Sequence, residues 1–372
     1  MLSGTGLPRE YHHRNDMNPL PGINLIFHSI RPGGGMERHI LDLISYASSN
    51  QGIGMRVITR KQAWPGSLPK HVEFVEMRDW TPFSRLNNYL FENRAFARCR
   101  PDWPCISVSR APGAQLCIVG GTHLGHLLDK GKKRFGFFDR ATIARETALY
   151  RLARKVVAHS GKVAGEIERL YQVEPQKITI LYPPVDTGKF CLAVRANRDA
   201  TRQAMGITDD QLLLLFPSNN HPLKGADLIL DALRTSDPRI RLAVVGKAPL
   251  NVPGVINLGF RNDMPTLYGA ADAVILASHY EAFGLVGPEA ILCGTPAIFA
   301  RTIGAAEVLS DAACIKFERN VEALRNAMQQ ALARFDSGTL SIADPAAHIR
   351  YPYSLPQHFD VLFKLLADAH NT

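Results

Sequence analysis

Short apolar runs alternate with amphipathic stretches along most of the chain. The apolar runs contain β-branched residues, which is typical of buried strands in a parallel sheet. The predicted strands span residues 23–28, 55–59, 72–77, 105–109, 116–119, 156–160, 212–216, 241–246 and 272–278. Apolar residues recur at helical spacing in residues 83–98, 139–153, 161–171, 288–294, 321–335 and 357–369. This alternation of strands and helices predicts an α/β fold.

The alternation runs twice, and the adjacent prolines Pro183 and Pro184 separate the two runs. Paired prolines interrupt regular structure, which suits a crossing between domains. A chain of 372 residues is also too long for one ordinary core. We therefore predict two Rossmann-like domains, residues 23–185 and 186–354, preceded by a flexible extension of residues 1–22.

The composition, 46% apolar and 21% charged, indicates a globular protein and argues against a disordered chain. No apolar run approaches the ~18 residues that a membrane-spanning helix needs. Residues 1–22 lack the apolar core of a signal peptide. The six cysteines show neither a C-x-x-C pair nor metal-ligand spacing, so we expect free thiols in a reducing cytoplasm and no bound metal.

The net charge of +9 is unevenly distributed. Residues 17–189 contain 25 Lys and Arg against 14 Asp and Glu, a net charge of +11. Residues 190–372 contain 16 against 18, a net charge of −2. This asymmetry predicts that the first domain meets an anionic partner.

The most informative stretch runs from Glu281 to Glu289, between the predicted strand 272–278 and the predicted helix 288–294. A loop between a strand and a helix N-terminus offers free backbone N–H groups to an anion. Gly284 and Gly287 leave the loop without Cβ atoms, so that a ligand can approach closely. The two carboxylates accept hydrogen bonds from hydroxyls, and a nucleotide sugar carries hydroxyls on both sides of a diphosphate. The alternative is a solvated loop in which Glu289 only complements the helix dipole.

Glu281-x7-Glu289, with Phe283 and Gly284 inside it and Gly294-Thr-Pro296 after it, resembles the nucleotide-sugar signature of retaining family 4 glycosyltransferases. The resemblance implies the GT-B fold, in which two Rossmann-like domains face a central cleft. The first domain would bind the acceptor and the second the donor, while helix 355–370 would pack back on the first. It also implies that Glu281 approaches the donor sugar and that Glu289 binds the ribose. Backbone groups of Phe283, Gly284 and Leu285 would then hold the sugar and diphosphate.

Lys224, before Gly225, matches the family lysine that reaches the donor diphosphate. Its charge would offset the charge that builds on the leaving nucleotide. Relatives usually have an arginine where Asn219 or Leu223 stands, so this loop has one cation where they have two. Lys247 and Arg261 are the candidates to fill that gap, and Arg261 also falls in a stretch that resembles the base-binding loop.

In the first domain, Gly34 and Gly35 belong to a triglycine between the first strand and a helix; they resemble the Gly-Gly pair of the family, and we predict that they bind the donor. Such a turn permits close approach of a backbone to a ligand, although a plain flexible turn is the alternative. His123 follows the strand 116–119, at the edge where ligands bind in open α/β sheets. In relatives, a His or Asp there faces the reacting sugar, which makes His123 the catalytic candidate and His126 the reserve. A purely structural histidine remains the alternative.

Lys130, Lys132, Lys133 and Arg134 form a basic cluster followed by the aromatic residues Phe135, Phe137 and Phe138. Basic residues beside aromatics suit an anionic membrane surface or a phosphorylated acceptor, and Lys132 and Arg134 are the acceptor-side candidates. The same composition serves nucleic acid in other proteins, and a solvated basic face is a further alternative. The absence of a known nucleic-acid motif argues against nucleic acid as the partner.

Together these features predict a retaining glycosyltransferase that moves a hexosyl or heptosyl unit from a nucleoside-diphosphate sugar to a glycan or lipid-linked acceptor. Lipopolysaccharide core or surface polysaccharide synthesis at the inner face of the cytoplasmic membrane is the expected setting. The sequence has no Asp-x-Asp motif, so we expect Lys224 and helix-end amides to do the work of a metal, without any cofactor. The alternatives are a nucleotide-sugar epimerase on the same fold and a non-catalytic or nucleic-acid-associated protein.

Overall fold

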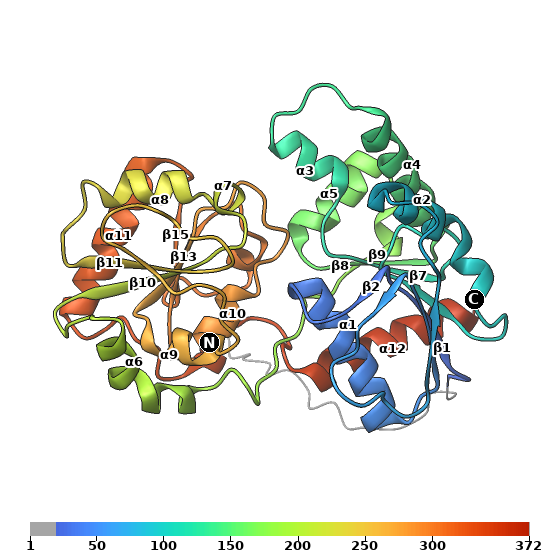
Figure 1. The fold of residues 1–372 in the computed structure, drawn as a ribbon, viewed down its shortest axis with the longest axis horizontal. Helices are drawn as coiled ribbons and strands as arrows, with labels where there is room; N and C mark the ends of the chain where they lie inside the picture. Colours follow the sequence, from blue (N-terminus) through green and yellow to red (C-terminus); the bar gives the residue numbers. More distant parts are fainter. Residues whose placement is uncertain (1–19, 372) are drawn as a thin grey trace, which may run out of the picture.

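The computed structural model describes residues 20–371 of the chain, so residues 1–19 of the predicted extension lie outside the described part. The described residues form two α/β domains that lie side by side (Figure 1). Each domain is built on a parallel sheet, and its central strands are short and almost fully buried because helices cover both faces, whereas the edge strands are partly exposed. The two-domain α/β prediction is confirmed.

The first domain contains a seven-stranded sheet with the order β5-β3-β1-β6-β7-β8-β9. Its strands are β1 (Ile23–Ile26), β3 (Met55–Thr59), β5 (Val72–Glu76), β6 (Cys105–Ser107), β7 (Leu116–Val119), β8 (Lys155–Ala158) and β9 (Ile178–Ile180). Its helices are α1 (Gly35–Tyr46), α2 (Ser84–Arg94), α3 (His123–Asp129), α4 (Phe137–Leu152) and α5 (Gly161–Tyr171). A separate two-stranded ladder joins β2 (Ser29–Ile30) to β4 (Lys61–Gln62).

Successive side chains of β1 enter different cores, because side chains alternate across a strand. Leu25 packs into a core shared with α1 and with α12 (Leu355–Asn371). Ile26 packs into the opposite core, which α2, α4 and α5 cover. The C-terminal helix α12 therefore completes one face of the first domain, although it follows the second domain in the chain (Figure 1).

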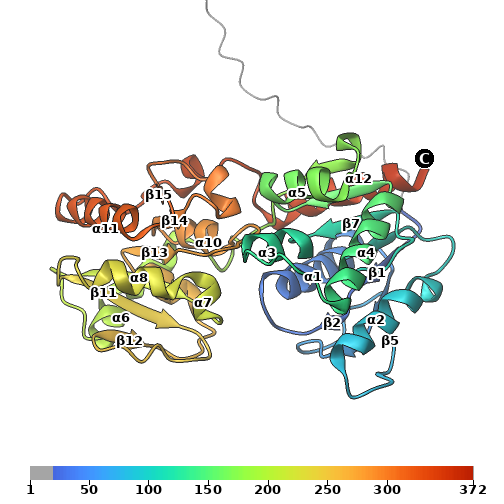
Figure 2. The ribbon, with the colours of Figure 1, turned by 90° about the horizontal axis from the view of Figure 1, so that it is seen from above.

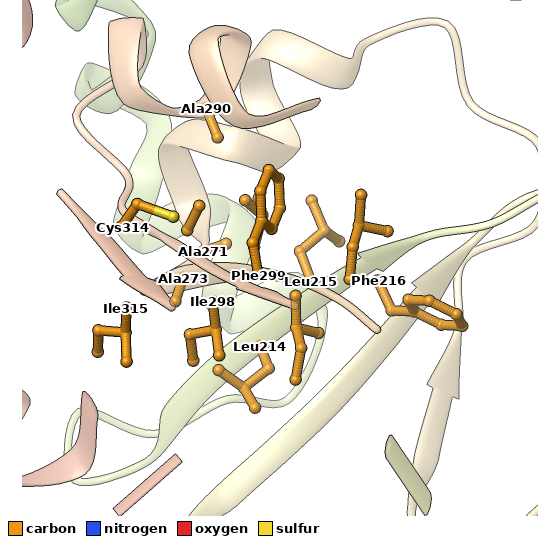
Figure 3. Close-up of a cluster of buried hydrophobic side chains, with 14 of the residues drawn as sticks. Leu214, Leu215, Phe216, Ala271, Ala273, Ala290, Ile298, Phe299, Cys314 and Ile315 are labelled. Atoms are coloured by element: carbon orange, nitrogen blue, oxygen red, sulfur yellow. The ribbon is translucent and has the colours of Figure 1, made fainter. Parts of the chain in front are cut away.

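The second domain contains a six-stranded sheet with the order β12-β11-β10-β13-β14-β15. Its strands are β10 (Leu212–Pro217), β11 (Ile240–Val245), β12 (Val255–Asn257), β13 (Ala273–Leu276), β14 (Ala297–Ala300) and β15 (Cys314–Phe317). Its helices are α6 (Arg198–Ala204), α7 (His221–Lys224), α8 (Ala226–Leu233), α9 (Met264–Ala270), α10 (Val286–Leu292) and α11 (Val321–Asp336). Figure 3 shows Phe299 and Cys314 pointing toward Ala290 of α10, while Ile298 and Ile315 point to the other face of the sheet.

The chain crosses between the domains twice, and the two crossings are tied together. Val185 pairs with Ser354 in an isolated parallel bridge, and the Tyr351 hydroxyl donates to the Pro183 carbonyl over 3.1 Å. The ring of Tyr182 packs against those of Tyr351 and Phe283, with centroids 5.1 and 5.8 Å away. The chain segment at the paired prolines is therefore one of two crossings between the domains, and aromatic packing holds the two crossings together.

Several elements differ from the sequence-based expectation. The sequence also predicts a helix near residues 305–309, but the structure has only a single 3-10 turn there, Gly304–Glu307. The short helices α3 and α7 lie in segments that we expected to be loops. Thr122 caps α3 by accepting from the Gly125 amide, and Asn220 caps α7 by accepting from the Leu223 amide. Such capping satisfies the open amides of a helix too short to have clear periodicity.

Candidate active site

The segment from Glu281 to Glu289 leaves the end of β13 and enters α10. The Gly304 amide donates to the Glu281 carbonyl, and the Ala305 amide donates to the Phe283 carbonyl. These bonds fix the loop through its carbonyl groups. Within residues 20–371, the amides of Phe283, Gly284 and Leu285 donate to no protein acceptor. The loop therefore presents a row of open N–H donors, which is a suitable arrangement for an anion.

The two glycines of this segment serve different purposes. Gly284 has a φ of +98°, a left-handed conformation that side chains with a Cβ rarely adopt. Gly287 has no such requirement, but a Cβ placed on it would lie 2.8 Å from the Phe299 ring. The expectation that Gly287 lets a ligand approach is therefore wrong, because this glycine makes room for core packing.

Lys224 and Glu281 form an ion pair at the end of β13. Lys224 ends α7 and precedes Gly225, whose φ is +78°. The Ala277 amide donates to the Lys224 carbonyl over 3.2 Å, and a Cβ on Gly225 would lie only 2.1 Å from the Ala277 carbonyl oxygen. The backbone thus holds Lys224 against the strand end, and its ammonium group faces the loop that carries Glu281.

Glu289, in the first turn of α10, forms an ion pair with Arg38 of α1 in the other domain. The side chain of Glu289 is only 5% exposed and that of Arg38 is 37% exposed. The Tyr268 hydroxyl donates to the second oxygen of Glu289 over 3.1 Å. Burial alone would lower the pKa of Arg38, but the Glu289 carboxylate, together with Tyr268 and Asp42, outweighs burial and raises that pKa. The predicted ribose-binding carboxylate is therefore already held by a cation from across the domain boundary.

The glycines of the first domain bring its backbone against this loop. A Cβ added to Gly35 would lie 3.3 Å from Cδ1 of Leu285, and one added to Gly121 would lie 3.3 Å from the Ala282 methyl group. Figure 2 shows α1 and α3 on the side of the first domain that faces the second. The predicted donor-side and acceptor-side loops therefore meet.

A hollow of about 330 Å³ opens beside this meeting point. It lies at the carboxyl ends of β1, β6 and β7, where ligands bind in open α/β sheets. Its polar walls come from His28, Glu37, Ser109, Arg110 and Glu146. Burial and, secondarily, the charge of Arg110 lower the pKa of His28. We refer to this space as the acceptor-side hollow.

The two predicted histidines take different places on α3. The Nε2 atom of His123 lies 3.1 Å from Oδ1 of Asp139, so its side chain turns toward α4. The ring of His126 packs edge-on against Tyr280, with 5.2 Å between centroids. His126, the reserve candidate, therefore contacts the second domain through Tyr280, whereas His123 pairs within the first.

Tyr280 reaches from the second domain into the first. Its hydroxyl donates to Oε2 of Glu166 over 2.8 Å and accepts from the Thr122 amide over 3.2 Å. The ammonium group of Lys162 lies 4.2 Å from the centre of its ring. Burial raises the pKa of Glu166. Tyr280 therefore fastens the start of the predicted donor loop to α3 and α5.

The other predicted residues make contacts of their own. Oδ1 of Asn219 accepts from the Lys247 amide over 3.2 Å, and the exposed Arg261 pairs with Asp263. The ring of Phe283 is buried in the core, so this residue can contact a ligand only through its backbone. All four residues of the basic cluster are exposed, among them the acceptor-side candidates Lys132 and Arg134. Lys132 pairs with Asp139 over 2.5 Å.

Sequence reasoning missed Arg38 and Tyr280. The position of Arg38 in the sequence was one available signal. A cation in the first turn of a helix is unfavourable beside the positive end of the helix dipole, so a nearby anion is expected. Arg319 was also overlooked, and its Nε donates to the Ala277 carbonyl over 2.9 Å. This places a second cation, a guanidinium, at the strand end that holds Lys224. Among the described residues no cluster of His, Cys, Asp and Glu has the arrangement of a metal site.

Comparison with known proteins identifies the family. Residues 33–189 match the family described as Glycosyltransferase Family 4, and residues 197–334 match that described as Glycosyl transferases group 1. A probable transglycosylase of Burkholderia thailandensis is 35% identical over 357 residues, covering 93% of this chain and 97% of that protein. The lipopolysaccharide glucosyltransferase WaaG of Escherichia coli is 27% identical over 366 residues, covering 88% and 94%.

Solved structures agree on the fold. A crystal structure of WaaG, a glycosyltransferase involved in lipopolysaccharide biosynthesis, has a TM-score of 0.73 at 21% identity and covers 94% of this chain and 98% of that one. Anabaena HepE in complex with UDP and glucose has a TM-score of 0.67 at 18% identity and covers 94% and 99%. By sequence and by fold together, this chain belongs to glycosyltransferase family 4 and is a glycosyltransferase with the GT-B fold.

Proposed function

We propose that the protein is a retaining glycosyltransferase that moves a hexosyl or heptosyl unit from a nucleoside-diphosphate sugar to a glycan or lipid-linked acceptor. The setting we propose is lipopolysaccharide core or surface polysaccharide synthesis. The observation that carries the proposal is the Lys224–Glu281 pair, which lies beside open loop amides. The matches to WaaG, named as a lipopolysaccharide glucosyltransferase, support the acceptor class.

The donor would lie along the segment from Glu281 to Glu289. Its diphosphate would meet the open amides and the ammonium group of Lys224, which offset negative charge as the glycosidic bond breaks. Glu281 would then accept hydrogen bonds from the sugar hydroxyls. The ribose would bond to Glu289, which is held from the other side by Arg38. Because both carboxylates already have cation partners, the donor would share or replace those contacts.

The acceptor hydroxyl would enter through the acceptor-side hollow. This position is supported by its place at the strand ends and by the contact of Gly121 with Ala282. His126 would face the reacting region from behind Tyr280, while His123, oriented by Asp139, would act on the acceptor within the first domain. The proposal thus gives both histidines acceptor-side roles, with His123 as the catalytic candidate.

An anionic membrane surface is the proposed location of the acceptor. The basic cluster of residues 130–134 is exposed, and next to it the side chains of Phe137 and Phe138 are 78% and 46% exposed. Among the described residues, no helix is both long and apolar enough to cross a bilayer. Exposed aromatic and basic side chains suit binding at the polar surface of anionic lipids.

The test is a thermal-shift panel of nucleoside diphosphates and nucleotide sugars, because a ligand that binds only the native state raises its melting temperature. The donor so identified is then incubated with and without a lipopolysaccharide core acceptor. Sugar transfer that requires the acceptor supports the proposal. Conversion of the donor without acceptor would instead indicate an epimerase, and donor binding without any turnover would indicate a non-catalytic binder.

A further inference from the structure

A second hollow, of about 460 Å³, lies in the first domain between α2 and α4. It is larger than the acceptor-side hollow. Its charged walls contain four cations and two carboxylates, namely Arg85, Arg110, Lys132, Arg145, Glu92 and Asp139. Tyr89, Phe137 and Phe138 supply aromatic walls. The lining is therefore positively charged on balance and partly aromatic.

Three of the four cations have a carboxylate partner, and Arg110 pairs with Glu146. Arg145 donates to Glu92 over 2.9 Å, and Lys132 pairs with Asp139 over 2.5 Å. Arg85 differs, because it has no carboxylate partner in the part of the chain that the structure describes. Its guanidinium lies 5.9 Å from the centre of the Phe138 ring. Arg85 therefore brings an uncompensated positive charge to the wall.

Arg110 connects this hollow to the acceptor-side hollow, because it lines both. Its Nε donates to Oε1 of Glu146 over 2.8 Å, and its Nη1 lies 4.0 Å from Oε1 of Glu92. With 40% of its side chain exposed, the outer edge of the guanidinium is open to a ligand. A molecule that extends from one hollow to the other must pass Arg110.

We propose that this second hollow is a subsite for a phosphate group on the acceptor glycan, bound by Arg85 and Arg110. The inference rests on the proposed function and makes it more specific, since the acceptor becomes a phosphorylated sugar chain longer than one residue. Guanidinium groups match phosphate oxygens through paired N–H donors. The ring of Phe138 offers an apolar face for the sugar that carries the phosphate.

The test is isothermal titration of the full chain with glucose 6-phosphate, glucose and glycerol 3-phosphate. Glucose 6-phosphate represents a phosphorylated sugar, glucose controls for the phosphate, and glycerol 3-phosphate represents a lipid headgroup. We expect glucose 6-phosphate to bind at least tenfold more tightly than the other two. Equal binding of glucose, or equal binding of glycerol 3-phosphate, would overturn the assignment to a phosphorylated glycan.

Variants then locate the binding. Arg85→Gln should weaken glucose 6-phosphate binding about tenfold, and Arg85→Glu should abolish it. Arg94→Gln is the matched control, since Arg94 lies on the same helix but stacks on Trp80 instead. Arg110→Gln should also weaken binding, but Arg110 neutralises the buried Glu146, so this variant counts only if its melting temperature is retained. Unchanged binding by Arg85→Glu would overturn the proposal.

Lys224→Gln separates this site from the donor site. If that variant loses glucose 6-phosphate binding while Arg85→Glu retains it, the phosphate binds beside Lys224 and the subsite does not exist. Failure of the proposed function is recognised independently, because it requires that no nucleotide sugar bind or turn over. Glucose 6-phosphate binding that depends on Arg85 would still establish the phosphate subsite in that case.

Discussion

Arg38 and Glu289 form an ion pair between the two domains although they are 251 positions apart in the chain. Arg38 lies in the first turn of α1, and Glu289 lies in the first turn of α10. The pair ties the glycine-rich turn of one domain to the signature loop of the other. It also holds in place the carboxylate that we assign to the donor ribose.

The first prediction concerns this pair. Glu289→Ala should weaken nucleoside-diphosphate binding by roughly 1–3 kcal/mol, because hydrogen bonds to the ribose are lost. Arg38→Gln leaves the buried carboxylate with Tyr268 as its partner, which should cost roughly 1–2 kcal/mol of stability. This loss of stability is smaller than the loss expected when a fully buried ion pair is broken, because Arg38 is partly exposed. Titration calorimetry and urea unfolding measure the two effects, and unchanged nucleotide affinity in Glu289→Ala would remove Glu289 from the donor site.

A second prediction concerns Lys224. Lys224→Ala should lower kcat on the order of 10²–10³-fold and change the donor KM less, because a fixed cation stabilises the leaving diphosphate most in the transition state. Steady-state kinetics with the identified donor provides the measurement. Arg319→Gln shows whether the nearby guanidinium shares this role, and Asn219→Arg shows whether a second loop cation is missing. Near-normal turnover by Lys224→Ala would mean that the diphosphate is held elsewhere.

The third prediction concerns the hydroxyl of Tyr280. Tyr280→Phe leaves the Thr122 amide without its acceptor and removes one donor to Glu166, which should destabilise the protein by roughly 1–2 kcal/mol. Because these bonds join the domains, the radius of gyration from small-angle scattering should also increase. Glu166→Gln retains an acceptor oxygen and should have a smaller effect. Identical unfolding and scattering of Tyr280→Phe and wild type would show that this contact does not hold the domains.

Membrane binding gives the fourth prediction. Replacing Lys130, Lys132, Lys133 and Arg134 with Gln should weaken binding to anionic vesicles tenfold or more, since each basic residue near the surface contributes about 1 kcal/mol. Lys132 should contribute least, because Asp139 already pairs with it. Binding should fall as salt shortens the Debye length to about 8 Å. Vesicle co-sedimentation is the assay, and four basic surface residues of the second domain serve as the matched control.

Equal vesicle binding by wild type and the four-residue variant would contradict the membrane role of this cluster. Donor binding should stay unchanged in the variant, which shows that it remains folded. Loss of binding to nucleic acid, but not to vesicles, would instead point to the nucleic-acid alternative.

Acid sensitivity is the fifth prediction, and it comes from three buried histidines. His39 of α1 lies between His159, after β8, and His358 of α12, with ring centroids 5.1 and 5.0 Å away. Burial lowers the pKa of His159 to about 4 and that of His358 to about 3. Burial, followed by the two neighbouring histidines, also lowers the pKa of His39. In the part of the chain that the structure describes, neither ring nitrogen of His39 has a hydrogen-bond partner.

These rings stay neutral in the folded state, whereas in the unfolded state they take up protons below about pH 6.5. The unfolded state then binds more protons, so the free energy of unfolding should fall as the pH drops from about 6.5 toward 4. For His159 alone the loss reaches about 3 kcal/mol. Urea unfolding at several pH values measures it. His39→Leu should reduce this dependence by the share of His39 and His370→Gln should not, and an unchanged slope in His39→Leu would exclude His39 as a contributor.

The sequence by itself determined the fold class, because apolar runs and helical spacing are local properties. β3 and β7 begin and end where the pattern predicts, and Ser160 caps α5 by accepting from the Val163 amide. The signature from Glu281 to Glu289 was readable because all its parts lie within one strand–loop–helix unit. Short elements such as α3 were not predicted, because a helix of fewer than two turns shows no clear hydrophobic periodicity.

Only the tertiary structure decided which side chains meet. The contacts of Arg38 with Glu289 and of Tyr280 with Glu166 join residues from different domains, and no local pattern specifies such a pairing.

The role of Gly287 also depended on the tertiary structure, because this glycine resembled a ligand-binding one until the position of the Phe299 ring was known. Likewise, the basic composition of the first domain was visible in the sequence, but folding decided that Asp139 neutralises Lys132 while Arg85 has no carboxylate partner within residues 20–371. The charge of each side chain follows from its residue type, whereas its pairing with an opposite charge depends on the distance between the two groups, which only tertiary packing sets.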